Sequence, residues 1–144
     1  SDLAAPQFRG GGRAHGPKPK FDQHVHVNKK QRRAAIRFLI GEKVRDNKLR
    51  IVDNVSLNAP KTKTVAQFLQ NTGIKGRVLF LAEGFYEGHV SVASDAHNNF
   101  AKSVANLPKT NFALAKNVNG YDLLLANEIV LTEAAWNEIN DWLK

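Results

Sequence analysis

The sequence predicts an α/β domain: a three-layer sandwich in which helices cover both faces of a mainly parallel four-stranded sheet, preceded by an extended N-terminal arm. Short apolar segments alternate with helical patterns along most of the chain, which is typical of a buried parallel sheet. With 144 residues, 42% of them hydrophobic, the chain has material for one core. Residues 1–28 show neither period. We therefore expect an arm over residues 1–28 and a globular domain over residues 29–144.

The arm is rich in glycine and proline, with Gly10-Gly11-Gly12, Gly16-Pro17 and Pro19 in close succession. Such residues favour extended or turn conformations. Few apolar residues accompany them, so this segment cannot pack a core of its own. We expect it to become ordered on a partner.

A helix is predicted from about residue 29 to residue 46. Asn28 is a suitable N-cap, and Gln31 follows at the spacing of a capping box. Apolar residues then recur on one helical face, namely Ile36, Leu39, Ile40 and Val44. Phe38 lies on the opposite face. It could stack on a base or pack against a segment outside this chain, and we favour the second interpretation.

The first turns of this helix carry Lys29, Lys30, Arg32 and Arg33. At 100° per residue these side chains point all round the helix axis, so this end cannot lie flat on a core. The free N–H groups and partial positive charge of a helix N-terminus add to the attraction for phosphate. We expect this end to project toward an anionic partner.

The remaining elements alternate along the chain. Strands are predicted over residues 49–53, 77–82, 112–115 and 128–131. Pro60 can open a helix that Gly73 closes. Ser94 can cap a second helix that ends before Pro108, and a short turn is expected over residues 121–125. Thr132 can cap a last helix, whose buried stripe would be Ala135, Trp136, Ile139, Trp142 and Leu143.

The positive charge is concentrated in the first third of the chain. Residues 1–50 hold 13 Lys or Arg against 4 Asp or Glu, whereas residues 51–144 hold 8 against 9. A basic arm on a near-neutral body is the footprint expected for a polyanion partner. Nucleic acid is the commonest such partner and an anionic membrane surface the second, while a merely solvated charged tail remains an alternative.

Composition excludes several classes of protein. The absence of cysteine rules out disulfides and thiolate chemistry within these residues. No apolar run approaches the roughly 18 to 20 residues of a membrane span, and the start lacks a signal-peptide core. We expect a soluble, intracellular protein. Because methionine is absent and the chain begins with Ser1, we also expect a front that was processed, truncated or engineered.

The glycine cluster does not have the context of a nucleotide-binding loop. Walker and dinucleotide motifs lie between a strand and a helix, whereas Gly10 to Gly12 precede every predicted element. His15, His24 and His26, with Asp22 as the nearest carboxylate, are a poor set for zinc. We expect no cofactor and no metal. The glycines instead suit an arm that follows a nucleic-acid backbone closely.

Candidate catalytic groups in the rest of the chain are scattered. They are Asp53, Glu83, Glu87, His89, Ser91 and Asp95. His89 and Ser91 fall in one predicted loop without a nucleophile-elbow motif. The polarity of a loop explains them equally well, so we expect no enzyme.

Several ordered segments resemble one known family. Arg9-Gly10-Gly11-Gly12 with Gly16-Pro17-Lys18-Pro19-Lys20, and then Asn28-Lys29-Lys30-Gln31-Arg32-Arg33, are similar to the RGGG…GPKP and NKKxRR motifs of the bacterial large-subunit ribosomal protein L-four family. Further matches are Pro60-Lys61-Thr62-Lys63, Asn106-Leu107-Pro108, Tyr121-Asp122-Leu123-Leu124 and Val130-Leu131-Thr132-Glu133. The resemblance covers nearly the whole chain and implies that roughly the family's first third is lacking. Arg13-Ala14-His15 departs from the usual, more apolar pattern.

This resemblance implies a structural protein of the 50S subunit on the cytoplasmic ribosome. Such a protein binds large-subunit ribosomal RNA early in assembly and contacts neighbouring ribosomal proteins, and some members bind their own messenger leader. Residues 1 to about 20 would be the returning half of a long loop. The residues expected to bind RNA are Arg9, Gly10, Gly11, Gly12, Arg13, Lys18, Lys20, Lys29, Lys30, Arg32, Arg33 and Arg37. The alternatives are a small α/β enzyme acting on a phosphorylated ligand at the carboxyl edge of the sheet, or a regulator of messenger RNA.

Overall fold

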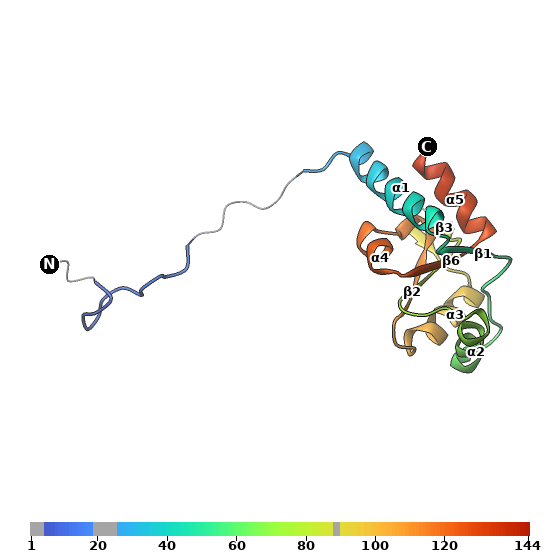
Figure 1. Cartoon of the computed structure of the whole chain (residues 1–144), viewed down its shortest axis with the longest axis horizontal. Coiled ribbons are helices and arrows are strands. Elements are labelled where there is room, and N and C mark those ends of the chain that lie inside the picture. The colour runs from blue at the N-terminus through green and yellow to red at the C-terminus, as the bar shows by residue number, and fades with distance from the viewer. Residues whose placement is uncertain (1–4, 19–25, 88–89) are drawn as a thin grey trace.

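The structure, a computed structural model, describes residues 5–18, 26–87 and 90–144 (Figure 1). Its helices are α1 (Lys29–Arg45), α2 (Thr62–Thr72), α3 (Asp95–Ala105), α4 (Gly120–Leu125) and α5 (Glu133–Leu143), with a 3₁₀ helix η1 (Ala115–Asn117). Its strands are β1 (Leu49–Val52), β2 (Val78–Ala82), β3 (Phe85–Glu87), β4 (Val90–Val92), β5 (Thr110–Leu114) and β6 (Glu128–Thr132).

Four strands form a parallel sheet in the order β1-β6-β2-β5. Leu49 of β1 pairs with Ile129 of β6, and Val78 of β2 pairs with Thr110 of β5. The last strand of the chain therefore lies between the first two. This arrangement confirms the predicted α/β class and the four-stranded parallel sheet.

Helices cover both faces of this sheet. On one face, Leu79 and Leu81 of β2 pack in a core with side chains from α1, α4 and α5. On the other, Val78 and Phe80 pack with side chains from α2 and α3. Figure 1 shows α1 and α5 above the sheet and α2 and α3 below it. The period of two along β2 thus divides one strand between two cores, as the predicted three-layer sandwich requires.

The capping residues fix the helix boundaries where the sequence predicted them. The Ser94 hydroxyl accepts a hydrogen bond from the His97 backbone N–H at 3.2 Å, and the Thr132 hydroxyl accepts one from Ala135 at 3.1 Å. Gly73 ends α2 in the left-handed region at φ 65°. These contacts satisfy backbone groups that a helix end leaves without intrahelical partners.

Strand β5 and one connecting segment depart most from the prediction. Strand β5 begins at Thr110 and not at residue 112, because β5 must match β2 in register and because the Thr110 hydroxyl donates to the Val104 and Leu107 carbonyls. Leu114 ends the strand. The segment expected to be a loop around Ser91 is instead an antiparallel hairpin, in which β3 and β4 pair Tyr86 with Ser91. His89, which was expected in that loop, lies outside the described residues.

None of the helices in the described ranges is long and apolar enough to cross a bilayer.

Candidate nucleic-acid interface

The described part of the arm holds itself together by short-range hydrogen bonds. The Phe8 N–H donates to Ala5 O at 3.0 Å, and the Gly11 N–H donates to Phe8 O at 2.9 Å. A Cβ on Gly11 would lie 2.0 Å from the Ala5 carbonyl oxygen, so only glycine fits this turn. Gly10 adopts φ 80° beside it. The arm's own fold thus accounts for two of the three clustered glycines.

The predicted basic residues of the arm lie in exposed positions. Arg9, Arg13 and Lys18 are exposed, and Lys20 lies outside the described residues. Figure 1 shows residues 5–18 well away from the sheet domain, so the structure does not bring them against the cations of α1. The two basic sets are separate parts of one chain.

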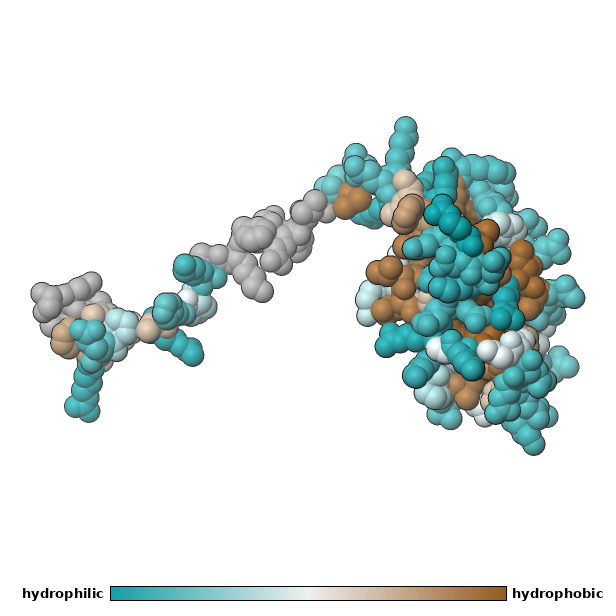
Figure 2. Space-filling view, viewed as in Figure 1, coloured by the Kyte–Doolittle hydropathy of each residue, from teal (hydrophilic) through white to brown (hydrophobic). Residues whose placement is uncertain are grey.

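The first turns of α1 project as predicted. Every residue from 29 to 35 is exposed, and Ile36 is the first to pack against the core. The Gln31 side chain accepts a hydrogen bond from the Asn28 backbone N–H at 3.4 Å, as the predicted capping box requires. Figure 2 shows a largely hydrophilic surface over this end and over the described arm. These first turns lie outside the two cores that the described residues form.

Four cations surround this projecting end: Lys29, Lys30, Arg32 and Arg33. Within the described ranges none of them takes part in an ion pair, whereas Lys48 and Arg50 pair with Asp46 and Glu128 at 3.0 and 2.8 Å. Unpaired cations on a rigid helix end keep their full field for an external anion. This end of α1 therefore presents the field of four cations to any anion that approaches it.

Arg37 differs from these four, although the sequence grouped it with them. Its Nη2 donates to the Leu143 carbonyl oxygen at the end of α5. Lys43, further along the same helix, donates to the Ala126 carbonyl at 2.6 Å. Both charged side chains thus donate hydrogen bonds that connect α1 to the rest of the domain. They hold the projecting end in a fixed direction.

Four large hydrophobic side chains are exposed on α1 and α4, and these two helices pack against each other. Phe38 is 68% exposed, Val44 48%, Tyr121 69% and Leu124 63%. Apolar patches are visible on this side of the domain in Figure 2. The exposure of Phe38 agrees with its predicted place on the outer face of the helix.

The carboxyl edge of the sheet holds a polar cluster that is occupied from within the protein. Glu83 follows β2, and its Oε2 accepts a hydrogen bond from the Thr132 hydroxyl at 2.5 Å. Its Oε1 lies 3.5 Å from Nε2 of His97, which is 4% exposed. Glu83 thus joins β2, α3 and the start of α5. Both of its carboxylate oxygens already have partners, so it is poorly placed for chemistry on a substrate.

The other candidate catalytic residues do not assemble around Glu83. Asp53 and Asp95 are exposed at the ends of β1 and α3, and Glu87 and Ser91 lie on the hairpin. A cavity of about 150 Å³ does lie at this edge, between β1, α2 and α3, but no titratable side chain lines it. Among the described residues no cluster of His, Asp or Glu could hold a metal ion.

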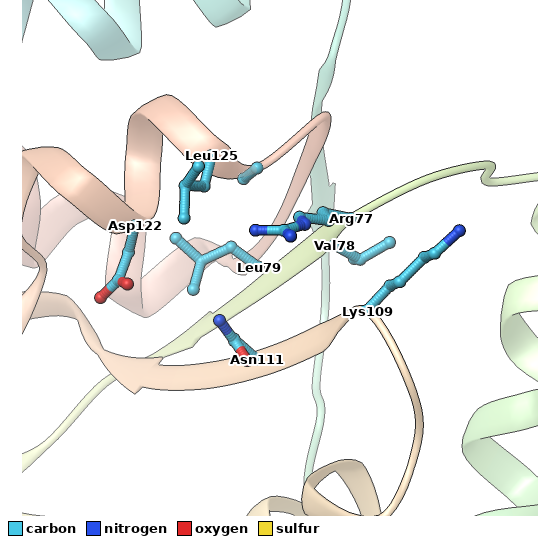
Figure 3. Close-up of a pocket in the computed structure, with 8 residues that line it drawn as sticks. Arg77, Val78, Leu79, Lys109, Asn111, Asp122 and Leu125 are labelled. Atoms are coloured by element: carbon cyan, nitrogen blue, oxygen red, sulfur yellow. The ribbon is translucent and has the colours of Figure 1, made fainter.

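At the opposite, amino edge of the sheet a pocket of about 240 Å³ lies between β2, β5 and α4 (Figure 3). Arg77 extends into it from the start of β2, Asn111 enters from β5, and Asp122 comes from α4. Lys109 stands at its rim and points away from the other labelled side chains. Val78, Leu79, Leu125 and Ala126 complete the lining.

The sequence prediction did not include this pocket. The sequence does contain a pattern that points to this pocket. A cation directly precedes three of the four strands of the parallel sheet, namely Lys48, Arg77 and Lys109. Each of these cations stands in a different part of the chain beside an apolar strand. Only the strand order shows that Arg77 and Lys109 are neighbours.

Comparisons with known proteins agree on one family. The sequence pattern of the ribosomal protein L4/L1 family matches residues 1–142. The large ribosomal subunit protein uL4 of Spiroplasma kunkelii is 34% identical over 139 residues, which are 96% of this chain and 62% of that relative. The protein of the same name from Maricaulis maris (strain MCS10) is 34% identical over 137 residues, 95% of this chain and 59% of the relative. The chain therefore spans about 60% of the length of these relatives.

Proposed function

Because the chain belongs to the ribosomal protein L4/L1 family, we propose that it is a non-catalytic component of the large ribosomal subunit that binds large-subunit ribosomal RNA. The arm and the projecting end of α1 supply the contacts, and the sheet domain anchors them. In this role the protein works on the cytoplasmic ribosome, supports subunit assembly and meets neighbouring ribosomal proteins.

The observation that carries the proposal is the set of four cations around the first turns of α1, which have no ion pair within the described residues. They surround the axis of a helix whose position is fixed by Arg37 and Lys43. Phosphates that approach from several directions would all meet a cation there, and each neutralised phosphate releases counterions. Such contacts fix the position of an RNA without reading its sequence.

The glycine-rich arm would extend this contact along the RNA. Arg9, Arg13 and Lys18 are exposed, and the turns around Gly11 keep the backbone compact. A narrow, basic segment can enter spaces between RNA helices that a globular domain cannot. Lys20 is expected to act with them.

The test is binding to bacterial large-subunit ribosomal RNA and to an unrelated RNA of equal length, each over a salt series. We expect the ribosomal RNA to bind more tightly at every salt concentration. Replacing Lys29, Lys30, Arg32 and Arg33 with alanine should lower the slope of log K against log salt by up to about 0.7 to 0.9 for each phosphate that is no longer neutralised.

A matched control separates a local contact from a general loss of charge. Arg32→Ala with Arg33→Ala removes two cations from the projecting end, and Lys63→Ala with Lys102→Ala removes two exposed cations from α2 and α3. The first pair should weaken binding more than the second. Equal effects of the two pairs, or equal affinity for both RNAs, would contradict the proposal. A preference for the protein's own messenger leader over ribosomal RNA would favour the regulator.

A further inference from the structure

We propose that the pocket at the amino edge of the sheet binds one unpaired nucleotide of the RNA, with the base inside the pocket and its phosphates on Arg77 and Lys109. This inference rests on the proposed function, since it adds a second contact to the same RNA. It concerns residues that lie in neither the arm nor α1.

The lining has the chemistry of a nucleotide site. Leu125 offers a half-buried apolar side chain beside which a base can lie, while Leu79 and Ala126 form the closed floor of the pocket and are 2% and 4% exposed. Asn111 can donate and accept hydrogen bonds, while the Asp122 carboxylate can only accept them. Within the described residues neither Asp122 nor Arg77 has a side-chain hydrogen bond or an ion pair to another group. The pocket thus combines an apolar wall, groups that can bind the edge of a base, and cations for phosphate.

The acidic residue narrows the choice of base. A carboxylate in contact with a base requires N–H groups on that base, and guanine presents two adjacent ones on its Watson–Crick edge. Asp122 alone would repel a bare phosphate, so a site built only for phosphate would not place it here. We therefore assign the pocket to an unpaired guanine.

The volume fits a single base. At about 240 Å³ the pocket lies below the roughly 300 to 1,000 Å³ of sites for drug-sized ligands and cofactors. A second hollow of about 560 Å³ shares Leu79, Asn111 and Asp122 with this pocket and leaves room beside it for the rest of an RNA strand. A base that swings out of an RNA strand needs to bury only itself, because its ribose and phosphates stay at the mouth, where Lys109 stands.

The backbone that carries the two cations is held in place before any ligand binds. The Arg77 carbonyl accepts hydrogen bonds from the N–H groups of Asn127 and Glu128 at 2.7 and 3.2 Å. The Lys109 carbonyl accepts one from Val78 at 2.9 Å. Lys109 itself has φ 61°, a left-handed conformation that costs a non-glycine residue free energy. Such strain at a pocket rim points to a functional position.

The pocket lies where an RNA bound to α1 would reach it. Helix α4 forms one wall and packs directly against α1. In Figure 1, α4 and the projecting end of α1 lie on the same side of the domain, the side from which the arm extends. One RNA can therefore follow the arm and α1 and place a nucleotide in this pocket.

Ultraviolet cross-linking of the chain to bacterial large-subunit ribosomal RNA, followed by nuclease digestion and mass spectrometry, tests the assignment. We expect a guanosine adduct on a peptide that contains Arg77 to Leu79 or Asn111. Asp122→Asn should reduce the guanosine share of this adduct while the chain stays folded by circular dichroism. Adducts confined to the arm and α1 would overturn the proposal.

Salt-dependent binding supplies an independent readout. Arg77→Ala with Lys109→Ala should lower the slope of log K against log salt by up to about 0.7 to 0.9 for each phosphate that these cations neutralise. The control is Lys63→Ala with Lys102→Ala, which removes the same charge from α2 and α3. If both double variants show the same salt slope while the unaltered chain still prefers ribosomal RNA, the pocket assignment is wrong and the proposed function stands. If the unaltered chain does not prefer ribosomal RNA, both the proposed function and the pocket assignment are wrong.

A free nucleotide shares the chemistry of the one in RNA, so guanosine monophosphate is titrated separately, without RNA. We expect no saturable binding of guanosine monophosphate in the concentration range where RNA binds, because the free nucleotide keeps only one of the two phosphates that flank a nucleotide in RNA. Saturable binding that Asp122→Asn abolishes, together with no adduct from RNA, would identify a site for the free nucleotide and overturn the assignment to RNA.

Discussion

Gly73 and Gly76 both have positive φ, at 65° and 97°, yet their surroundings differ. A Cβ on Gly73 would meet nothing within 4 Å, whereas one on Gly76 would lie 2.7 Å from Nδ2 and 2.8 Å from Cγ of Asn127. The first position requires glycine for its backbone conformation alone. Gly76 is required both for its backbone conformation and because the Asn127 side chain occupies the space of a Cβ. Asn127 in turn holds the backbone of Arg77, since its N–H donates to the Arg77 carbonyl.

Alanine at each of the two positions separates these costs. We expect Gly73→Ala to lower the free energy of unfolding by about 1 to 2 kcal/mol, the cost of a left-handed conformation. Gly76→Ala should lower it further, to a total of about 3 kcal/mol or more, because the clash with Asn127 adds to that cost. Urea denaturation measures both. Equal losses would show that the Asn127 side chain moves aside freely.

Thr132 has two functions in the fold, since its hydroxyl accepts from Ala135 as the cap of α5 and donates to Glu83. Its side chain is 2% exposed. We expect Thr132→Ala to lower the free energy of unfolding by about 1 to 3 kcal/mol, because the cap is removed and Glu83 is left without a partner on one oxygen. Thr62→Ala, at an exposed position in the first turn of α2, should change it by less than about 0.5 kcal/mol.

Single residues were predicted well where a local rule governs them. Ser94, Thr132 and Gly73 serve helix ends, and the reason for each lies within three or four residues of sequence. Arg77 and Lys109 could not be recognised in this way. They become neighbours only because β5 pairs with β2, and that pairing is a property of the whole sheet.

At the scale of elements, α1 combines two kinds of arginine. Arg33 is exposed and without an ion pair among the described residues, while Arg37 donates to the Leu143 carbonyl. The helical pattern in the sequence grouped both as basic residues near the same end. One turn of helix is enough to change the neighbour from solvent to the end of α5, and the sequence does not show where α5 ends relative to α1.

These two arginines should therefore respond in opposite ways to substitution. We expect Arg37→Ala to lower the free energy of unfolding by about 1 kcal/mol, because the Leu143 carbonyl loses a charged donor at a partly exposed site. Arg33→Ala should leave stability within about 0.5 kcal/mol and weaken RNA binding instead. Chemical denaturation and RNA titration of both variants check this. A loss of stability in Arg33→Ala would show that the helix end is not free.

The long elements were predicted more reliably than the short ones. Helix α1 and the apolar strands β2 and β6 have strong periodic or apolar patterns, and their predicted bounds are within a residue or two of those observed. The β3–β4 hairpin was missed because each strand has only three residues and Phe85 is 62% exposed. A strand that short carries no detectable period.

At the scale of the whole molecule, charge and core are carried by different parts of the chain. Residues 1–50 hold 13 of the 21 Lys and Arg, and the described part of the arm makes its hydrogen bonds within itself. The sheet domain draws its two cores from residues 36–143. Stability and RNA affinity should therefore be separable by deletion.

A chain that begins at residue 26 tests this separation. We expect its free energy of unfolding to stay within about 0.5 kcal/mol of that of the full chain. Its salt slope for ribosomal RNA should fall by up to about 3, because Arg9, Arg13, Lys18 and Lys20 are removed. Thermal unfolding and filter binding give the two values. A large loss of stability would mean that the arm supports the domain.

The position of β6 has a consequence for how the protein is made. β6 follows the other strands of the sheet in sequence, yet it lies between β1 and β2. Strand β1 pairs only with β6, so Leu49 has no partner in the sheet until Ile129 is in place. Pairings this distant in sequence form slowly, and during synthesis they cannot form until β6 has emerged. The basic N-terminal residues thus leave the ribosome long before the domain behind them can close. For that interval the nascent chain exposes unpaired apolar strands next to a strongly basic segment, a state in which chains are prone to aggregate.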